Sequence, residues 1–248
     1  MQVFTHSQFD IDASLGRIDR YLTQAVDAET VEQVPAEKDF TFDNGYYVEC
    51  CAVFVDIRDS SRLTFEDTKK NVSKIYRSFV SEITAVMQSL KQCKHINIVG
   101  DCVSGIFDTS NRQSDLLEVF LMVAKIHSII KLLNQKLAKH DLPEIKVGVG
   151  VDYGKTLVVK AGYDGSGLKD LVWMGRVVNN AAHLCDKANK DNNPIILCSR
   201  NFYDGLGQAK CTKYNVGMVL CADFLNAVKS VDCLGGSFYM AYPEKGIL

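Results

Sequence analysis

The sequence lacks the features that mark membrane, secreted and fibrous proteins. A membrane-spanning helix needs about 18 consecutive apolar residues, and the 248 residues contain no such stretch. The first residues show no basic segment followed by an apolar stretch, so we expect no signal peptide and a cytoplasmic location. With only 4 prolines and 17 glycines, the composition excludes collagen-like chains and chains dominated by linkers.

An excess of charge of one sign is also missing. The 28 Lys and Arg residues nearly balance the 30 Asp and Glu residues, which leaves a formal net charge of −2. Nonspecific nucleic-acid binders and proteins that attach to membranes through basic clusters are strongly positive. We therefore expect neither nucleic acid nor a membrane as a partner.

Cysteine is plentiful, but it shows no disulfide or zinc pattern. The nine cysteines are odd in number and include no C-x-x-C pair. Most lie inside apolar runs such as residues 48–55 and 195–198. Cysteines in such runs behave as small buried hydrophobes, which suits a reducing compartment. We expect Cys50, Cys51 and Cys102 to pack rather than to take part in chemistry.

The chain divides into an N-terminal extension, residues 1–44, and a main domain, residues 45–248. The extension is polar and acidic, with an amphipathic pattern over residues 11–26 and a loop-like stretch over residues 33–44. In the main domain, apolar runs predict strands at 47–55 and 145–151, and residues 96–107 form a hairpin pattern around Gly100-Asp101. Helical periodicity covers residues 64–91 and 114–140.

Shorter elements follow in the second half of the main domain. We expect strands at 156–160, 171–174 and 195–198, a helix at 176–189, and two last strands near 216–220 and 237–242. The order β-α-β-β-α-β with appended elements predicts an α+β fold of the ferredoxin-like type.

Two aspartates stand where this fold would bring them together. Asp56 closes the first strand, and Asp101 lies at the tip of the hairpin. These strands are neighbours in a β-α-β-β sheet, so both carboxylates can meet at one edge. Paired hard oxygen ligands hold Mg²⁺ or Mn²⁺ beside a nucleotide. The alternative is that Asp56 caps the following turn and Asp101 is an ordinary turn residue.

Two further segments carry polar groups at helix starts. After Asp56 the chain continues Ile57-Arg-Asp-Ser-Ser61 into a helix, and free backbone N–H groups at such a start suit an anion. The same residues could simply cap the helix. Asn179 and His183 are four residues apart, so they share one helix face and could steady an oxyanion or a ribose. Alternatively, Asn179 caps the helix and His183 is solvated.

Four short segments together resemble the class III nucleotidyl cyclase domain. They are Phe54-Val-Asp-Ile57, Ile98-Val-Gly-Asp101, Val147-Gly-Val-Gly-Val-Asp-Tyr-Gly154 and Gly175-Arg-Val-Val-Asn-Asn-Ala-Ala182, in the family's order and spacing. The resemblance implies conversion of a nucleoside triphosphate to a 3′,5′-cyclic monophosphate and pyrophosphate. It also implies two Mg²⁺ or Mn²⁺ ions and a head-to-tail homodimer whose active sites form between subunits.

The resemblance also implies roles for individual residues. Asp56 and Asp101 would hold both metals, with the Ile57 carbonyl assisting. Main-chain amides of residues 58–61 (Arg58, Asp59, Ser60 and Ser61) would hold the β- and γ-phosphates. Asn179 would orient the ribose.

The departures from the family pattern concern the base and the transition state. Asn97 stands where adenylate cyclases usually carry a Lys that reads adenine, and Val172 or Trp173 stands at the second reading position. His183 replaces the usual transition-state Arg, and we expect Arg176, Lys187, Lys213 or Lys229 as possible substitutes.

Intact metal ligands with altered base readers imply changed specificity. The lead-in Asn44-Gly-Tyr-Tyr-Val48 and the motif Asp56-Ile-Arg-Asp-Ser-Ser61 resemble those of the pyrimidine cyclases of bacterial Pycsar anti-phage systems. That similarity implies cyclic UMP or cyclic CMP from UTP or CTP, as a signal for a downstream effector that the cyclase need not contact. Two alternatives stay open: an adenylate or guanylate cyclase with atypical base readers, and a non-catalytic cyclase fold that senses a nucleotide.

Overall fold

The computed structural model describes residues 8–24, 27–66, 68–163, 168–191 and 193–206, and the backbone of residues 229–233 and 236–241. The chain forms two compact units. The larger unit comprises residues 49–154 and 176–248, and the smaller unit comprises residues 1–48 and 155–175. Strands β2 (Asn44–Ile57) and β5 (Val147–Tyr163) contribute residues to both units.

A mixed sheet forms one layer of the larger unit. Its strand order is β3-β4-β2-β5-β7-β9-β8. The strands other than β2 and β5 are β3 (Cys93–Val99), β4 (Cys102–Asp108), β7 (Ile196–Cys198), β8 (Lys229–Cys233) and β9 (Gly236–Ala241). Strand β4 is antiparallel to both β2 and β3, whereas β5 is parallel to β7.

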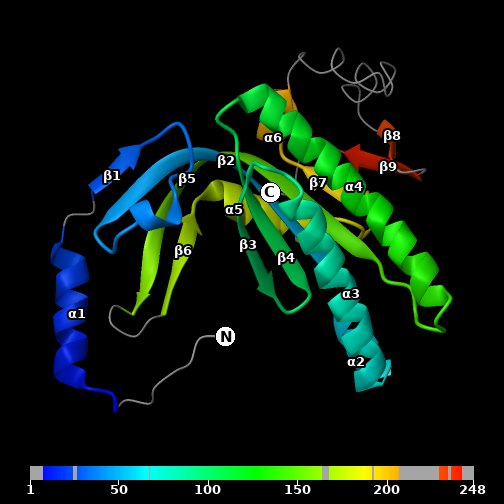
Figure 1. Cartoon of the computed structure of the whole chain (residues 1–248), viewed down its shortest axis with the longest axis horizontal. Coiled ribbons are helices and arrows are strands. Elements are labelled where there is room, and N and C mark those ends of the chain that lie inside the picture. Colours follow the sequence, from blue (N-terminus) through cyan, green and yellow to red (C-terminus); the bar gives the residue numbers. More distant parts are fainter. Residues whose placement is uncertain are drawn as a thin grey trace. The chain divides into compact units, whose positions relative to one another are not determined.

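Helices α3 (Lys69–Gln88) and α4 (Arg112–Ala138) pack against each other and against this sheet (Figure 1). Their fully buried side chains include Phe79 and Ile83 from α3 and Met122 from α4, which share one core with Val53 of β2 and Phe107 of β4. The order β2-α3-β3-β4-α4-β5 confirms the predicted β-α-β-β-α-β arrangement and the α+β class.

The structure differs from the predicted elements in several places. The single helix expected over residues 64–91 is two helices, α2 (Ser60–Glu66) and α3, because the Thr68 side chain accepts from the Asn71 N–H at 3.3 Å and starts a new helix. The two strands expected over 145–151 and 156–160 are one strand, β5. Helix α6 (Arg200–Leu206) and strand β8 were not predicted. The strand expected near 216–220 lies outside the described residues.

The remaining helix of the larger unit, α5 (Arg176–Lys187), lies directly on β5. A Cβ atom on Gly150 would lie 2.0 Å from the Ala181 carbonyl oxygen and 2.2 Å from the Cys185 nitrogen. Only a residue without a side chain allows this approach. The glycines of the Val147-Gly-Val-Gly segment therefore bring α5 against the sheet.

The smaller unit contains the N-terminal segment. It holds α1 (Ile11–Thr23), β1 (Asp27–Thr30), a 3₁₀ turn (Glu37–Asp39) and the hairpin of β5 with β6 (Leu168–Met174). Val34, Phe40, Val48 and Val158 form its small core. The helix predicted over residues 11–26 is confirmed and ends at Thr23. The boundary expected at residue 44 stays a prediction.

None of the helices in the described part of the chain has the length and hydropathy of a membrane span.

Candidate active site

Asp56 and Asp101 lie side by side at one end of the sheet. Asp56 is the second-last residue of β2 and pairs in register with Cys102 of β4. Asp101 lies in the turn that joins β3 to β4, where Gly100 adopts a φ of +62°. The two carboxyl groups are close enough to hydrogen-bond. The sequence therefore placed this pair correctly, and its role as a metal site stays a prediction.

Burial and the neighbouring carboxylate of Asp101 raise the pKa of Asp56, while Arg58 opposes the shift. Like charges this close disfavour double ionisation unless a cation compensates them. Within the described residues, no group of three or more His, Cys, Asp and Glu side chains is arranged to hold a metal ion. A divalent ion at this pair would therefore need further oxygen ligands from the Ile57 carbonyl and from a bound phosphate.

The side chain of Arg58 is buried behind Asp56. One guanidinium nitrogen lies 2.6 Å from Asp56 Oδ2, and the other donates to the Asp186 carbonyl at 3.1 Å. The main-chain N–H of Arg58 donates to the Lys146 carbonyl at 2.7 Å. This corrects the expectation that the Arg58 amide holds phosphate, because the neighbouring strand already takes that donor.

Helix α2 begins at Ser60, two residues after Arg58. Asp59 has a φ of 54°, and its carbonyl accepts from the N–H groups of Arg62 and Leu63 at 3.0 and 3.2 Å. These bonds close the first helical turn, which orients the preceding amides along the helix axis. Ser60 hydrogen-bonds to Tyr76 of α3, and burial together with the Asp101 charge raises the pKa of that phenol. Tyr76 was not singled out from the sequence, where it is one apolar position of a helix.

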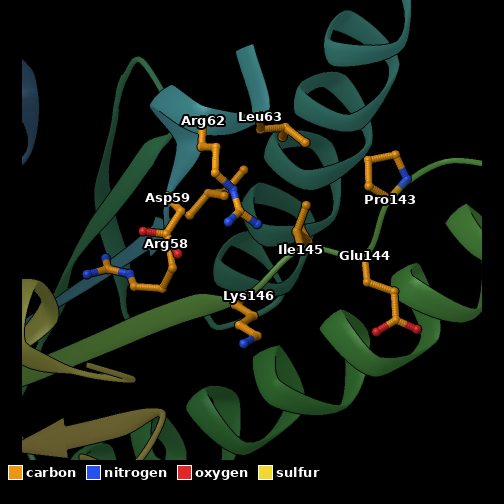
Figure 2. A pocket seen from close by; sticks show the side chains of 9 residues that line it. Arg58, Asp59, Arg62, Leu63, Pro143, Glu144, Ile145 and Lys146 are labelled. Carbon is orange, nitrogen blue, oxygen red and sulfur yellow. The ribbon is translucent and has the colours of Figure 1, made fainter. Parts of the chain in front are cut away.

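A cavity of about 400 Å³ opens beside α2 (Figure 2). It is lined by Ile57, Arg58, Asp59, Arg62, Leu63, Pro143, Glu144, Ile145 and Lys146. Figure 2 shows the Arg62 side chain reaching into this space, whereas the Arg58 guanidinium turns to the other side of Asp59. Arg62 and Lys146 therefore bring positive charge to the cavity, and Asp59 and Glu144 bring negative charge to it. Lys146 could not be found from the sequence alone, since its place depends on the pairing of β5 with β2.

Helix α5 carries the polar residues predicted for the ribose and the transition state. Asn179, His183 and Arg176 are exposed, while Val177, Ala181, Leu184 and Cys185 on the same helix are buried. The four-residue spacing places Asn179 and His183 on one exposed face, as expected. Lys187, in the last turn of α5, is also exposed.

A buried carboxylate fixes the start of α5. Asp152 is 1% exposed, and it accepts from the Tyr153 N–H at 2.7 Å and from the Ser199 hydroxyl. Burial raises its pKa, and hydrogen bonds from Ser199, Tyr153 and Asn180 oppose the shift, as does the charge of Arg176. Asp152 thus hydrogen-bonds to Asn180, the residue that follows Asn179 on α5. The sequence offered no signal for this role beyond an acid in an apolar strand.

The residues expected to read the base belong to different units. Asn97 is exposed on β3, in register with Ser104 of β4. Val172 and Trp173 lie on β6 in the smaller unit, where Val172 is 40% exposed and Trp173 packs against the small core. Of the C-terminal candidates, Lys213 lies outside the described residues, and only the backbone of Lys229 is described.

The described cysteines are free thiols. Burial, followed by the charges of Asp56 and Asp101, raises the pKa of Cys102 to about 11. That thiol is therefore neutral near pH 7 and acts as a packing group beside the carboxylates.

Comparison with known proteins decides the family. Residues 43–219 match the family described as the adenylate and guanylate cyclase catalytic domain. The chain belongs to this family. It is 40% identical over 211 residues to a protein of Gulbenkiania mobilis named uridylate cyclase, covering 82% of both chains. A protein of Treponema porcinum with the same name is 40% identical over 213 residues, covering 84% of this chain and 74% of the relative.

Solved structures agree on the fold of this nucleotide cyclase. The adenylyl cyclase CyaB from P. aeruginosa matches 82% of this chain and 98% of its own with a TM-score of 0.61 at 18% identity. The guanylyl cyclase Cya2 matches 79% of this chain and 90% of its own with a TM-score of 0.59 at 16% identity. Both comparisons support the cyclase fold.

Proposed function

We propose that the protein cyclises UTP to 3′,5′-cyclic UMP and pyrophosphate, with CTP as the second pyrimidine substrate. The observation that carries the proposal is the adjacent Asp56–Asp101 pair at one end of the sheet. The two relatives at 40% identity, both named uridylate cyclase, support the choice of a pyrimidine.

Asp56, Asp101 and the Ile57 carbonyl would hold two Mg²⁺ or Mn²⁺ ions. When bound, such ions lower the pKa of a hydroxyl and neutralise phosphate charge, which suits attack of the 3′-hydroxyl on the α-phosphate. The two carboxylates also need the positive charge of the ions. The neighbouring Asp101 charge raises the pKa of Asp56, and a bound cation would favour the ionised form of both side chains.

The triphosphate would extend from the carboxylates into the cavity beside α2. Arg62 and Lys146 line that cavity together with Asp59 and Glu144, and the two cations would pair with the β- and γ-phosphates. The amides of Asp59, Ser60 and Ser61 at the start of α2 are the remaining main-chain donors predicted for these phosphates. This mode of binding would require the α-phosphate to lie beside the two aspartates.

The exposed face of α5 would complete the site from a second subunit of a head-to-tail homodimer. Asn179 would orient the ribose, and His183 or Arg176 would stabilise charge on the α-phosphate. A protonated His183 can provide this charge, so its contribution depends on pH. Lys187, Lys213 and Lys229 are further candidates for a cation that contacts the triphosphate.

Asn97 would read the base, and Val172 or Trp173 stays the second base reader predicted from the sequence. A carboxamide donates one hydrogen bond and accepts another, so it can pair with a uracil carbonyl and the ring N–H. A flipped carboxamide can also pair with cytosine, which is why CTP is the second substrate proposed.

In the cell, the product would act as a second messenger in anti-phage defence. The cyclase would work in the cytoplasm, and the effector would sense the cyclic nucleotide without contacting the enzyme.

The test of the catalytic pair uses two variants and one control. Asp56→Ala and Asp101→Ala should each reduce cyclic UMP formation from UTP and Mn²⁺ to background. Asp204→Ala removes an exposed aspartate that pairs with Arg200 at 2.7 Å, and it should retain full activity. Turnover that survives in either active-site variant contradicts the proposal.

A second candidate function follows from His183, which stands where the family usually has an Arg. This substitution favours a nucleotide-binding domain without turnover. Calorimetric binding of UTP from pH 6 to pH 8, with no cyclic product across that range, would support that alternative over the enzyme.

A further inference from the structure

Arg58 is a charged side chain that the proposed chemistry does not use directly. Its side chain is 4% exposed, compared with 31% for Asp56, so it reaches the carboxylate from the protein interior. One guanidinium nitrogen binds both Asp56 Oδ2 at 2.6 Å and the Asp56 carbonyl at 3.3 Å. The salt bridge therefore fixes one carboxylate oxygen and leaves the other for a ligand.

The second guanidinium nitrogen reaches a different element. It donates to the Asp186 carbonyl at 3.1 Å, near the C-terminal end of α5. The last carbonyls of a helix lack partners within the helix, and they carry partial negative charge that favours a cation. A single buried guanidinium therefore connects Asp56 of β2 to the end of α5.

The packing around Arg58 leaves little room for movement. A Cβ atom on Gly148 would lie 2.8 Å from the carbonyl oxygens of Cys185 and Ala188 and 3.0 Å from Arg58 Cζ. The guanidinium thus lies between β5 and α5. Its position depends on that close approach.

We propose that Arg58 is a positioning residue that orients Asp56 for a divalent cation by tying this carboxylate to the C-terminal end of α5. The inference rests on the metal-binding role proposed above for Asp56. An arginine is needed because its planar fork can donate to two acceptors at once, whereas a lysine ammonium is a single point charge. Residues that orient a metal ligand typically change metal affinity by about ten- to a hundredfold when they are replaced.

The experiment measures the rise in melting temperature of the full chain with increasing Mn²⁺ alone, without nucleotide. Wild type should be stabilised, and Asp56→Asn should lose the effect. In Arg58→Lys we expect the same rise to need about tenfold more Mn²⁺. Arg200→Lys is the matched control, because Arg200 is an exposed arginine that also pairs with an aspartate at 2.7 Å.

Gly148→Ala tests the same contact without changing a charge. The added methyl group should displace the end of α5 from Arg58 and raise the Mn²⁺ requirement as Arg58→Lys does. Circular dichroism without metal verifies that both variants are folded. If either variant unfolds, the other still decides the question.

The possible results separate the two proposals. An Mn²⁺ response in Arg58→Lys and Gly148→Ala equal to that of wild type overturns the role of Arg58 and leaves the metal site intact. A wild type without any Mn²⁺ response contradicts the metal site and, with it, the role of Arg58.

Discussion

At the scale of residues, Asp56 shows how much the sequence can and cannot reveal. Its position at a strand end, and that of Asp101 at a hairpin tip, follow from local patterns, so their meeting was predictable. The burial of Arg58 was not predictable, because its partner Asp186 lies 128 residues away on another element. Lys146 and Asp152 were missed for the same reason, since long-range pairing gives them their roles.

Asn97 provides a prediction about base recognition. Asn97→Ala removes both hydrogen bonds proposed for uracil, and each is worth about 0.5–1.5 kcal/mol. We expect kcat/KM for UTP to fall by about ten- to a hundredfold. Thr68→Ala, which removes an N-cap of α3, should lower stability without changing the preference among substrates. An unchanged kcat/KM for UTP in Asn97→Ala, relative to the other nucleotides, would exclude Asn97 as a base reader.

His127 provides a prediction about pH and stability. Burial in α4, and the nearby Lys131, lower the pKa of His127 to about 4 from its usual 6.5. The unfolded chain therefore takes up this proton at a higher pH than the folded chain. The contribution of neutral His127 to the free energy of unfolding is therefore complete above pH 6.5, and it is lost as the pH falls toward 4.

The loss from His127 should be on the order of 2–3 kcal/mol. His127→Gln cannot titrate, so its free energy of unfolding should fall less between pH 7 and pH 4.5 than that of wild type. Urea unfolding at both pH values measures this difference. Equal pH dependence in the two proteins would contradict a buried neutral histidine.

At the scale of elements, the contact between β5 and α5 positions the predicted ribose and transition-state residues. The order β-α-β-β-α-β could be derived from periodicity, and so could the hairpin around Gly100. The break between α2 and α3 was missed, although residues 66–71 are all polar and Thr68 is a typical N-cap residue. The role of Gly150 also lay outside local reasoning, since it depends on which helix crosses the strand.

Two glycine variants test this contact by comparison. Gly150→Ala places a Cβ atom 2.0 Å from a backbone carbonyl, so we expect a loss of about 3 kcal/mol or more in stability, together with loss of activity. Gly16→Ala in α1 meets nothing within 4 Å and should stabilise the protein by about 0.5–1 kcal/mol. Thermal or urea unfolding measures both. A tolerated Gly150→Ala would contradict the close packing of α5.

At the scale of the whole molecule, the proposed active site needs residues from two chains. Asp56→Ala and Asn179→Ala subunits should each be inactive alone. In a mixture, half of the dimers contain one of each and have one intact site. Random exchange should therefore restore about a quarter of wild-type activity.

Unfolding and refolding the two variants together provides this test, and each variant refolded alone is the control. Activity that stays at background in the mixture would contradict an active site shared between subunits.

The central claim is that this cyclase uses UTP. The most direct measurement incubates the wild-type protein and Mn²⁺ with an equimolar mixture of ATP, GTP, CTP and UTP, and then quantifies all four cyclic products by mass spectrometry. We expect cyclic UMP as the main product, with cyclic CMP second. Cyclic AMP or cyclic GMP as the main product, or no cyclic product at all, would contradict it.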